Sequence, residues 1–113
     1  MGKIFITGGS GLIGSIVNKK LSKNHEIINL DLHKSNINST KTIIGDMNNF
    51  EDILSGSKGC SSIIHLGAVI EVNTSWELVL KNNFESTRNV YESARLNNID
   101  KVIFASSNHA VGL

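Results

Sequence analysis

Short apolar runs alternate along the chain with longer amphipathic segments. Each run has the length of a strand and is almost continuously apolar, which is typical of a parallel strand that is buried on both faces. A glycine-rich or polar segment follows most of the runs, and such segments are typical of turns. The pattern predicts five strands, at residues 3–7, 26–31, 41–44, 61–66 and 101–105.

Apolar residues at helical spacing predict three helices between the strands. The first follows residue 11, and its residues at helical spacing are Leu12, Ile13, Ile16, Val17 and Leu21. The second begins at a capping box, in which Asn48 precedes Glu51 by three residues, and ends near residue 56. The third runs from Thr74 to about residue 97. We expect its inward face to consist of Trp76, Leu80, Phe84, Thr87, Val90, Tyr91 and Ala94.

Strands that alternate with helices predict a doubly wound α/β fold. Right-handed crossovers give its parallel sheet the strand order 3-2-1-4-5, with helices on both faces. After the fifth strand, residues 106–113 contain no segment long enough for a covering helix. We therefore expect the fold to be incomplete at its C-terminal side and the chain to be the N-terminal part of a longer protein.

Composition and charge narrow the class of protein. The 113 residues are 40% hydrophobic and 19% charged, which fits one globular domain. The net charge is +1 without any basic run, so nucleic-acid binding is disfavoured. Cys60 is the single cysteine and cannot form an internal disulfide, and no apolar run is long enough for a membrane span. A cytoplasmic protein that binds neither nucleic acid nor membrane is expected.

A glycine-rich loop at residues 8–14 is the sharpest chemical signal. Its glycines fit both G-x-x-G-x-x-G and G-x-G-x-x-G. Because the loop joins a strand to a helix, the amides near Leu12 and Ile13 and the positive end of the helix dipole would face a bound pyrophosphate. Gly14 would let helix and strand pack closely. The alternative is a glycine turn of a flavodoxin-like or methyltransferase domain.

Two acidic residues end the next two strands. Asp31 follows the glycine loop at the spacing of a carboxylate that binds both hydroxyls of an adenosine ribose, and it would repel a 2′-phosphate. This favours NAD over NADP as the cofactor. Asp46 stands where it would meet the adenine edge. The alternatives are a solvated residue at a strand end for Asp31 and a turn or cap residue for Asp46.

Other chemically capable residues have weaker signals. His65 lies in an apolar strand without a second ligand at metal-binding spacing, so we interpret it as a core histidine bonded to backbone. Cys60 has no nearby base and is expected to be an unreactive thiol. Residues 106–109, Ser-Ser-Asn-His, follow the fifth strand at the rim where open α/β sheets bind ligands. They could bind a polyol, or form a polar surface loop.

These motifs together resemble a known family. The segments concerned are residues 7–14, Asp31, residues 45–47, residues 65–68, Asn83 with Thr87 and Asn89, and residues 104–107. Over essentially the whole chain and in the same order, they resemble the extended short-chain dehydrogenases, the NAD-dependent epimerase/dehydratase family. Residues 104–112 look most like the uronate dehydrogenases. The resemblance implies a Rossmann fold.

The resemblance also implies a set of site residues. The implied NAD contacts are Gly8, Gly11, Leu12, Ile13 and Gly14 around the pyrophosphate, Asp31 and Leu32 at the ribose, Asp46 and Met47 at the adenine, Leu66, Gly67 and Ala68 along the fourth strand, Asn83 on the long helix, and Ser106. Ser107 is the implied catalytic residue, which would bond the reacting sugar oxygen. Ser107, Asn108 and His109 are the implied substrate contacts. No metal site is implied.

The implied function is the cofactor-binding portion of an NAD-dependent sugar oxidoreductase that oxidises a uronate or a related aldose at C1. The alternatives are a nucleotide-sugar epimerase or dehydratase of the same superfamily and a non-catalytic NAD-binding module. The family's Tyr-x-x-x-Lys pair has no match, because Tyr91 is the single tyrosine and no lysine follows it at four residues. We expect residues 1–113 to form one NAD-binding domain without the substrate lobe, inactive by itself. A homodimer stays open.

Overall fold

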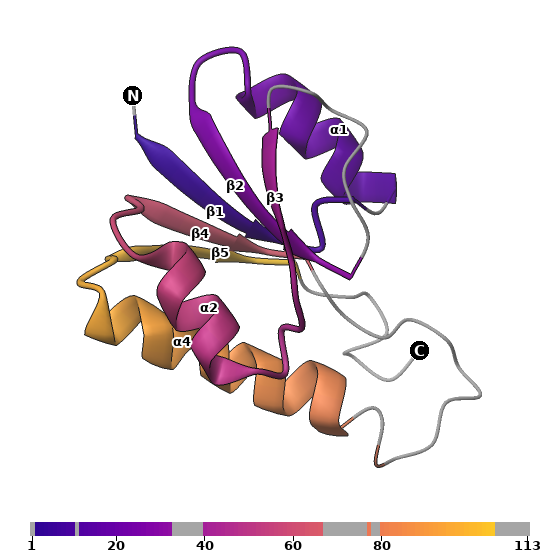
Figure 1. Ribbon diagram of the computed structural model, residues 1–113, viewed down its shortest axis with the longest axis vertical. Coiled ribbons are helices and arrows are strands. Elements are labelled where there is room, and N and C mark those ends of the chain that lie inside the picture. Colours follow the sequence, from indigo (N-terminus) through magenta and orange to yellow (C-terminus); the bar gives the residue numbers. More distant parts are fainter. Residues whose placement is uncertain (1, 11, 33–39, 67–76, 78–79, 106–113) are drawn as a thin grey trace.

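The chain forms one parallel sheet with helices on both faces in a computed structural model that describes residues 2–10, 12–32, 40–66, 77 and 80–105 (Figure 1). The strands are β1 (Lys3–Thr7), β2 (Glu26–Asp31), β3 (Thr40–Ile44), β4 (Ser62–His65) and β5 (Lys101–Phe104). They pair in the order β3-β2-β1-β4-β5, and every pair is parallel. The predicted fold class and strand order are confirmed.

The helices divide between the two faces of the sheet (Figure 1). Helix α1 (Leu12–Leu21) lies on one face, and α2 (Phe50–Ser57) and α4 (Ser86–Leu96) lie on the other. A π-helix, η1 (Leu80–Glu85), leads directly into α4. The predicted start of the long helix, at Thr74, lies outside the described residues. Its described part differs from the expected single α-helix because residues 80–85 form a π-helical segment.

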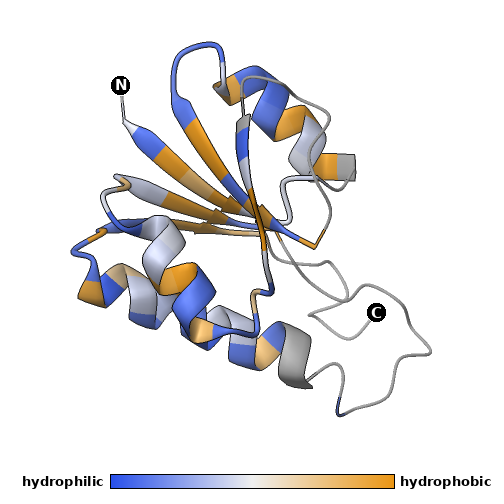
Figure 2. Ribbon diagram, viewed as in Figure 1, coloured by the Kyte–Doolittle hydropathy of each residue, from blue (hydrophilic) through white to orange (hydrophobic). Residues whose placement is uncertain are grey.

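Alternate residues of the strands belong to two apolar layers. Figure 2 shows hydrophobic orange along the strands and both orange and blue on the helices. Between the sheet and α2 with α4, the buried residues are Phe5, Ile28, Leu30, Ile53, Cys60, Ile63, Val90, Ala94 and Ile99. On the α1 face they are Ile4, Ile6, Ile27 and Ile64. Burying a large apolar side chain contributes about 1.5–3 kcal/mol, so these layers fix the strand register and bring the carboxyl ends of the strands to one rim.

The cap of α2 is one residue later than predicted. Asn49, not Asn48, is the N-cap, with extended backbone angles of φ −93° and ψ 109°. Its side-chain oxygen accepts hydrogen bonds from the amides of Glu51 and Asp52, at 3.0 and 3.4 Å. The amide of Asn48 instead donates to Asp46 Oδ1 at 2.9 Å. The turn that begins at Asp46 therefore uses Asn48 and leaves the cap to its neighbour.

The inward face of the long helix also differs from the prediction. Tyr91 is 50% exposed and Phe84 is 58% exposed, whereas Val90 and Ala94 are buried. The buried stripe of α4 includes Ser86 and Ser93, which the apolar pattern did not count. Since neighbouring positions of a helix lie about 100° apart, a stripe centred one residue away from the predicted one turns Tyr91 outward.

Candidate functional site

A glycine turn at the carboxyl end of β1 begins the candidate site. Gly8 has a φ of +73°, a left-handed conformation that favours glycine. Its amide donates to the carbonyl oxygen of Leu30 at 2.9 Å, which ties the turn to β2. A Cβ on Gly14 would collide with the Gly8 carbonyl oxygen and the backbone of Gly9. The turn therefore packs directly on the first turn of α1, as the glycine spacing predicts.

The first turn of α1 supplies backbone donors beside this glycine turn. Leu12 and Ile13 open the helix, and amides at this position have no acceptor within their own helix. The side chain of Ile13 is exposed, and no acidic residue occupies the first turn. The helix's own first turn therefore adds no negative charge to the positive end of its dipole, and together with the glycine turn this end suits the phosphates of a dinucleotide.

Two asparagines that the sequence analysis missed hold the glycine turn. Asn18 on α1 and Asn29 on β2 are both fully buried. The amide of Gly9 donates to Asn29 Oδ1 at 2.7 Å, and Asn18 Nδ2 donates to the Gly9 carbonyl oxygen at 2.9 Å. The sequence did contain a signal for them, which is a polar residue at a buried position of each apolar pattern. A buried side-chain amide almost always has a hydrogen-bond partner, so each asparagine could have been expected to bind a neighbouring group.

Asp31 lies beside the same turn, at the end of β2. Its Oδ2 accepts a hydrogen bond from the amide of Ser10 at 3.0 Å, and its Oδ1 accepts one from the amide of Leu32 at 2.7 Å. The Leu32 side chain is exposed. Each carboxylate oxygen has two lone pairs, so both can still accept a hydroxyl donor. The turn and the carboxylate are thus joined into one surface.

The loop after β3 is fixed next to Asp31. The amide of Gly45 donates to the Asp31 carbonyl oxygen at 3.0 Å. Asp46 is exposed, and its amide donates to Asp52 Oδ2 at 3.1 Å. Met47 is half-buried, and its carbonyl oxygen accepts a bond from Asn89 Nδ2 of α4 at 3.2 Å. Helix α4 therefore helps to hold the loop that the sequence associates with adenine.

His65 is a core histidine, as predicted, but its described partners are hydroxyl groups rather than the expected backbone. Its Nδ1 lies 2.6 Å from Thr7 Oγ1, and its Nε2 lies 3.3 Å from Thr87 Oγ1. Thr87 donates to the Asn83 carbonyl oxygen at 2.6 Å, so its oxygen is placed to accept from Nε2–H, and in a neutral ring Nδ1 would then accept from Thr7. Burial lowers the pKa of His65 to about 4, which favours this neutral form.

Through the hydroxyls of Thr7 and Thr87, the imidazole of His65 connects β4 to β1 and α4, which border the site. The amide of Leu66 donates to both the carbonyl oxygen and the Oγ1 of Thr7, at 3.0 and 3.2 Å. Asn83, in η1, is half-buried and reaches this network through its carbonyl oxygen. The end of β4 is therefore fixed to the end of β1, beside the glycine turn.

The described part of the chain brings one group of predicted site residues to the carboxyl rim of the sheet. That group is Gly8, Leu12, Ile13, Gly14, Asp31, Leu32, Asp46, Met47 and Leu66. Asn83 lies on η1 at the edge of this group. The remaining predicted residues lie outside the described residues: Gly11, Gly67, Ala68, Ser106, Ser107, Asn108 and His109.

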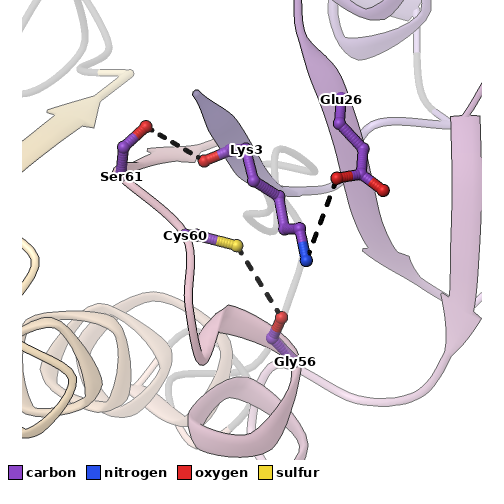
Figure 3. Close-up of polar contacts among 5 residues, drawn as sticks. All are labelled: Lys3, Glu26, Gly56, Cys60 and Ser61. Atoms are coloured by element: carbon purple, nitrogen blue, oxygen red, sulfur yellow. Dashed lines mark hydrogen bonds and ion pairs between the residues drawn. The ribbon is translucent and has the colours of Figure 1, made fainter. Parts of the chain in front are cut away.

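Cys60 lies just before β4, at the end of the sheet opposite the carboxyl rim. Figure 3 shows it with its neighbours. Its Sγ is 4.0 Å from the Gly56 carbonyl oxygen, and burial raises the pKa of its thiol. Nearby, Ser61 Oγ donates to the Lys3 carbonyl oxygen at 3.1 Å, and Lys3 Nζ lies 3.8 Å from Glu26 Oε2. A buried thiol that favours its protonated form agrees with the expected lack of reactivity.

Two other kinds of site are absent among the described residues. No group of three or more His, Cys, Asp or Glu side chains there could hold a metal ion. No helix in the same part of the chain is both long enough and apolar enough to cross a membrane.

Comparisons with known proteins agree with the geometry. Residues 4–113 match the family described as "NAD dependent epimerase/dehydratase family". The chain is 30% identical over 115 residues to a uronate dehydrogenase of Agrobacterium fabrum, covering 99% of this chain and 43% of the relative. It is 36% identical over 125 residues to a putative UDP-glucose 4-epimerase of Methanocaldococcus jannaschii, covering 96% of this chain and 39% of the relative.

A solved structure shows the same fold. A variant of uronate dehydrogenase from Agrobacterium tumefaciens, complexed with NAD, superposes with a TM-score of 0.84 at 27% identity. The comparison covers 95% of this chain and 41% of the solved chain. The chain thus spans about 40% of the length of the proteins that it resembles.

Proposed function

The chain belongs to the NAD-dependent epimerase/dehydratase family, as its sequence predicts, and we propose that it is the cofactor-binding portion of an oxidoreductase that oxidises a uronate or a related aldose at C1. The contact that carries the cofactor half of the proposal is the hydrogen bond from the Ser10 amide to Asp31, at 3.0 Å. It joins a turn suited to phosphates to a carboxylate suited to ribose hydroxyls. Residues 1–113 are proposed as one nucleotide-binding domain, with the substrate lobe elsewhere.

The proposed cofactor contacts follow from this arrangement. Backbone amides at the start of α1, those of Leu12 and Ile13, would hold the pyrophosphate with Gly8, while Asp31 would bind the ribose. When bound, NAD supplies the hydride acceptor. The other proposed contacts are Gly11, Gly14, Leu32, Asp46, Met47, Leu66, Gly67, Ala68, Asn83 and Ser106.

The substrate half rests on similarity to uronate dehydrogenase. Oxidation at C1 removes a hydride from carbon and a proton from the C1 hydroxyl, so the protein must orient the sugar and accept that proton. Ser107 is the proposed catalytic residue that bonds the reacting oxygen, and Asn108 and His109 are the proposed substrate contacts. The family's tyrosine and lysine pair, which would accept the proton, has no counterpart in this sequence.

The direct test is NADH formation by the full-length protein. Purified protein would be mixed with NAD and either galacturonate or glucuronate, with a non-oxidisable polyol as the control. Steady NADH formation that depends on the uronate is the expected result. NAD binding without NADH formation from any uronate or aldose would overturn the substrate half and leave the cofactor half standing.

A nucleotide-sugar epimerase or dehydratase is the second candidate. It is favoured by the 36% identity to a putative UDP-glucose 4-epimerase, which exceeds the 30% identity to a uronate dehydrogenase. Such an enzyme would convert a UDP-sugar without net NADH formation, because the cofactor is restored in each turnover. Incubation of the protein with UDP-glucose or UDP-galactose, followed by analysis of the UDP-sugar products, would distinguish such an enzyme from a uronate dehydrogenase. A non-catalytic NAD-binding module would convert neither class of sugar.

Assembly and location stay predictions. A homodimer would give the exposed Phe84 and Tyr91 of the η1–α4 segment an apolar partner surface. Sedimentation of the full-length protein would test it, and a monomer at micromolar concentration would argue against it. The cytoplasmic location also stays a prediction from the sequence.

A further inference from the structure

We propose that Asn18 and Asn29 are positioning residues that fix the glycine turn and thereby set the affinity of the chain for the pyrophosphate of a dinucleotide. The inference rests on the proposed function, because it assigns residues to the same site. Neither asparagine belongs to the glycine spacing or to the acidic strand ends that suggested the site.

The two side chains grip Gly9 from opposite elements. Asn29 of β2 accepts a hydrogen bond from the Gly9 amide at 2.7 Å, and Asn18 of α1 donates one to the Gly9 carbonyl oxygen at 2.9 Å. Both polar groups of this residue are therefore bonded to side chains. The turn cannot rotate at Gly9 without losing buried hydrogen bonds.

The same contacts extend to the acidic end of the site. Asn29 Nδ2 donates to Ser10 Oγ at 3.0 Å, and the Ser10 amide donates to Asp31 Oδ2 at 3.0 Å. The amides of Gly9 and Ser10 are thus committed to protein acceptors. Among the described residues that follow Gly8, the amides at the start of α1 are the ones that none of these bonds within the turn occupies, so the asparagines influence which amides face the ligand.

Burial shows that this arrangement serves position more than stability. Asn29 lies opposite Ile6 in β1, in the layer that otherwise contains Ile4, Ile27 and Ile64. An apolar side chain at this place would gain burial energy, whereas an asparagine must bond all its polar groups merely to offset the loss of water. Both asparagines are fully buried and bonded to the turn.

The asparagines also explain the glycine at position 9. A Cβ on Gly9 would collide with Asn29 Oδ1 and with Asn18 Nδ2. Gly9 therefore follows from the side chains that hold it, while Gly8 is required by its left-handed φ of +73°. This difference predicts that Gly9→Ala is tolerated better when both asparagines are replaced by alanine.

The experiment compares NAD with adenosine as ligands of the full-length protein. Asn29→Ala and Asn18→Ala are expected to weaken NAD binding by roughly three- to tenfold in calorimetric titration. Asn18→Ala should leave adenosine binding unchanged, because adenosine lacks the pyrophosphate. The matched control is Asn97→Ala, whose side chain donates to Leu54 O and Ser57 Oγ, both at 2.9 Å, between α4 and α2. It should lower the melting temperature without changing NAD affinity.

The outcomes separate the inference from the proposed function. Absence of NAD binding by the unmodified protein would overturn both. NAD affinities of the asparagine variants equal to that of the unmodified protein would overturn only the inference, as would a parallel loss of NAD and adenosine binding by Asn18→Ala. Where Asn29→Ala does not fold, Asn18→Ala, which removes the bond to the Gly9 carbonyl oxygen and keeps Asn29, decides the question. Melting temperatures of Gly9→Ala with and without the double asparagine replacement supply a readout that is independent of the ligand.

Discussion

At the scale of single residues, Asp31 combines two tasks in one carboxylate. It accepts bonds from the amides of Ser10 and Leu32, and in the proposed function its remaining lone pairs accept the ribose hydroxyls. A negative charge at this place would repel a 2′-phosphate, which connects the local geometry to the choice between NAD and NADP.

Replacement of Asp31 tests this choice. Asp31→Ala should reduce the preference for NAD over NADP by about 1.5–3 kcal/mol, the contribution expected of hydrogen bonds from ribose hydroxyls to a charged carboxylate, which a 2′-phosphate would lose. Titration of both nucleotides by calorimetry measures it. Asp31→Asn is the control, because it keeps an acceptor for the Ser10 amide and removes the charge. Equal affinities of the unmodified protein for the two nucleotides would contradict the assignment.

His65 makes stability depend on pH. Burial lowers its pKa from 6.5 to about 4, so between these pH values the unfolded state binds more protons than the folded state. Stability should therefore be fully present above pH 6.5 and should fall as the pH decreases toward 4, by up to about 3 kcal/mol. Urea unfolding at a series of pH values measures this change.

The variant His65→Gln isolates this contribution. It removes the titrating ring while its amide can still contact the hydroxyls of Thr7 and Thr87. Its stability should be lower above pH 6.5 and should change less than that of the unmodified protein between pH 6.5 and 4. An identical slope in both proteins would assign the pH dependence to other groups.

At the scale of elements, the sequence predicted the positions of the strands well but predicted the buried faces of the helices only in part. The residues of β1 and β2 were predicted with their observed bounds, because strands buried on both faces are continuously apolar. The stripe of α4 was misjudged, because Ser86 and Ser93 are buried although their side chains are polar. A pattern based on apolar residues cannot count such serines.

The candidate site shows the same division. Gly8 and Asp31 were predictable, because their spacing along the chain carries the signal. Asn18 and Asn29 were not, because their partners are backbone groups that become neighbours only when α1 packs on the sheet. Residues that act through tertiary contacts leave only a break in the apolar pattern as their signal.

The cap of α2 provides a test at this scale. Asn49→Ala should lower the free energy of unfolding by about 1 kcal/mol, because the amides of Glu51 and Asp52 lose their side-chain acceptor. Asn49→Asp is the control, which keeps the acceptor and adds a charge that the helix dipole favours. Urea unfolding measures both. A larger loss of stability for Asn49→Asp than for Asn49→Ala would argue against the assigned cap.

At the scale of the whole molecule, the chain has the parts for holding a cofactor and lacks an identified base. The residues that bind phosphates and ribose in the proposal lie on one rim, while the proton acceptor has no match in the sequence. Residues 1–113 by themselves should therefore bind NAD and form no NADH from uronates. Absorbance of NADH during prolonged incubation measures this. Steady formation of NADH would require another base, and His109 would be the first candidate because histidine is the commonest general base of enzymes.

The second feature of the whole molecule is the exposure of β5 at the edge of the sheet. β5 is the last strand in the described sheet order, and Ile103 is 52% exposed although its register partner, Ile64, is 8% exposed. An edge strand with an exposed apolar side chain is a template for association. We therefore expect residues 1–113 to self-associate in light scattering.

The paired variants Ile103→Thr and Ile64→Thr separate exposure from packing. Both keep a β-branched side chain in a strand, but Ile103→Thr removes exposed apolar surface and should reduce self-association while changing stability by less than about 1 kcal/mol. Ile64→Thr puts a hydroxyl into the layer beneath α1 and should cost about 2 kcal/mol or more. Light scattering and urea unfolding of both variants measure the difference. If the unmodified chain is already monodisperse and Ile103→Thr destabilises it as much as Ile64→Thr does, then Ile103 is packed in solution and β5 is covered.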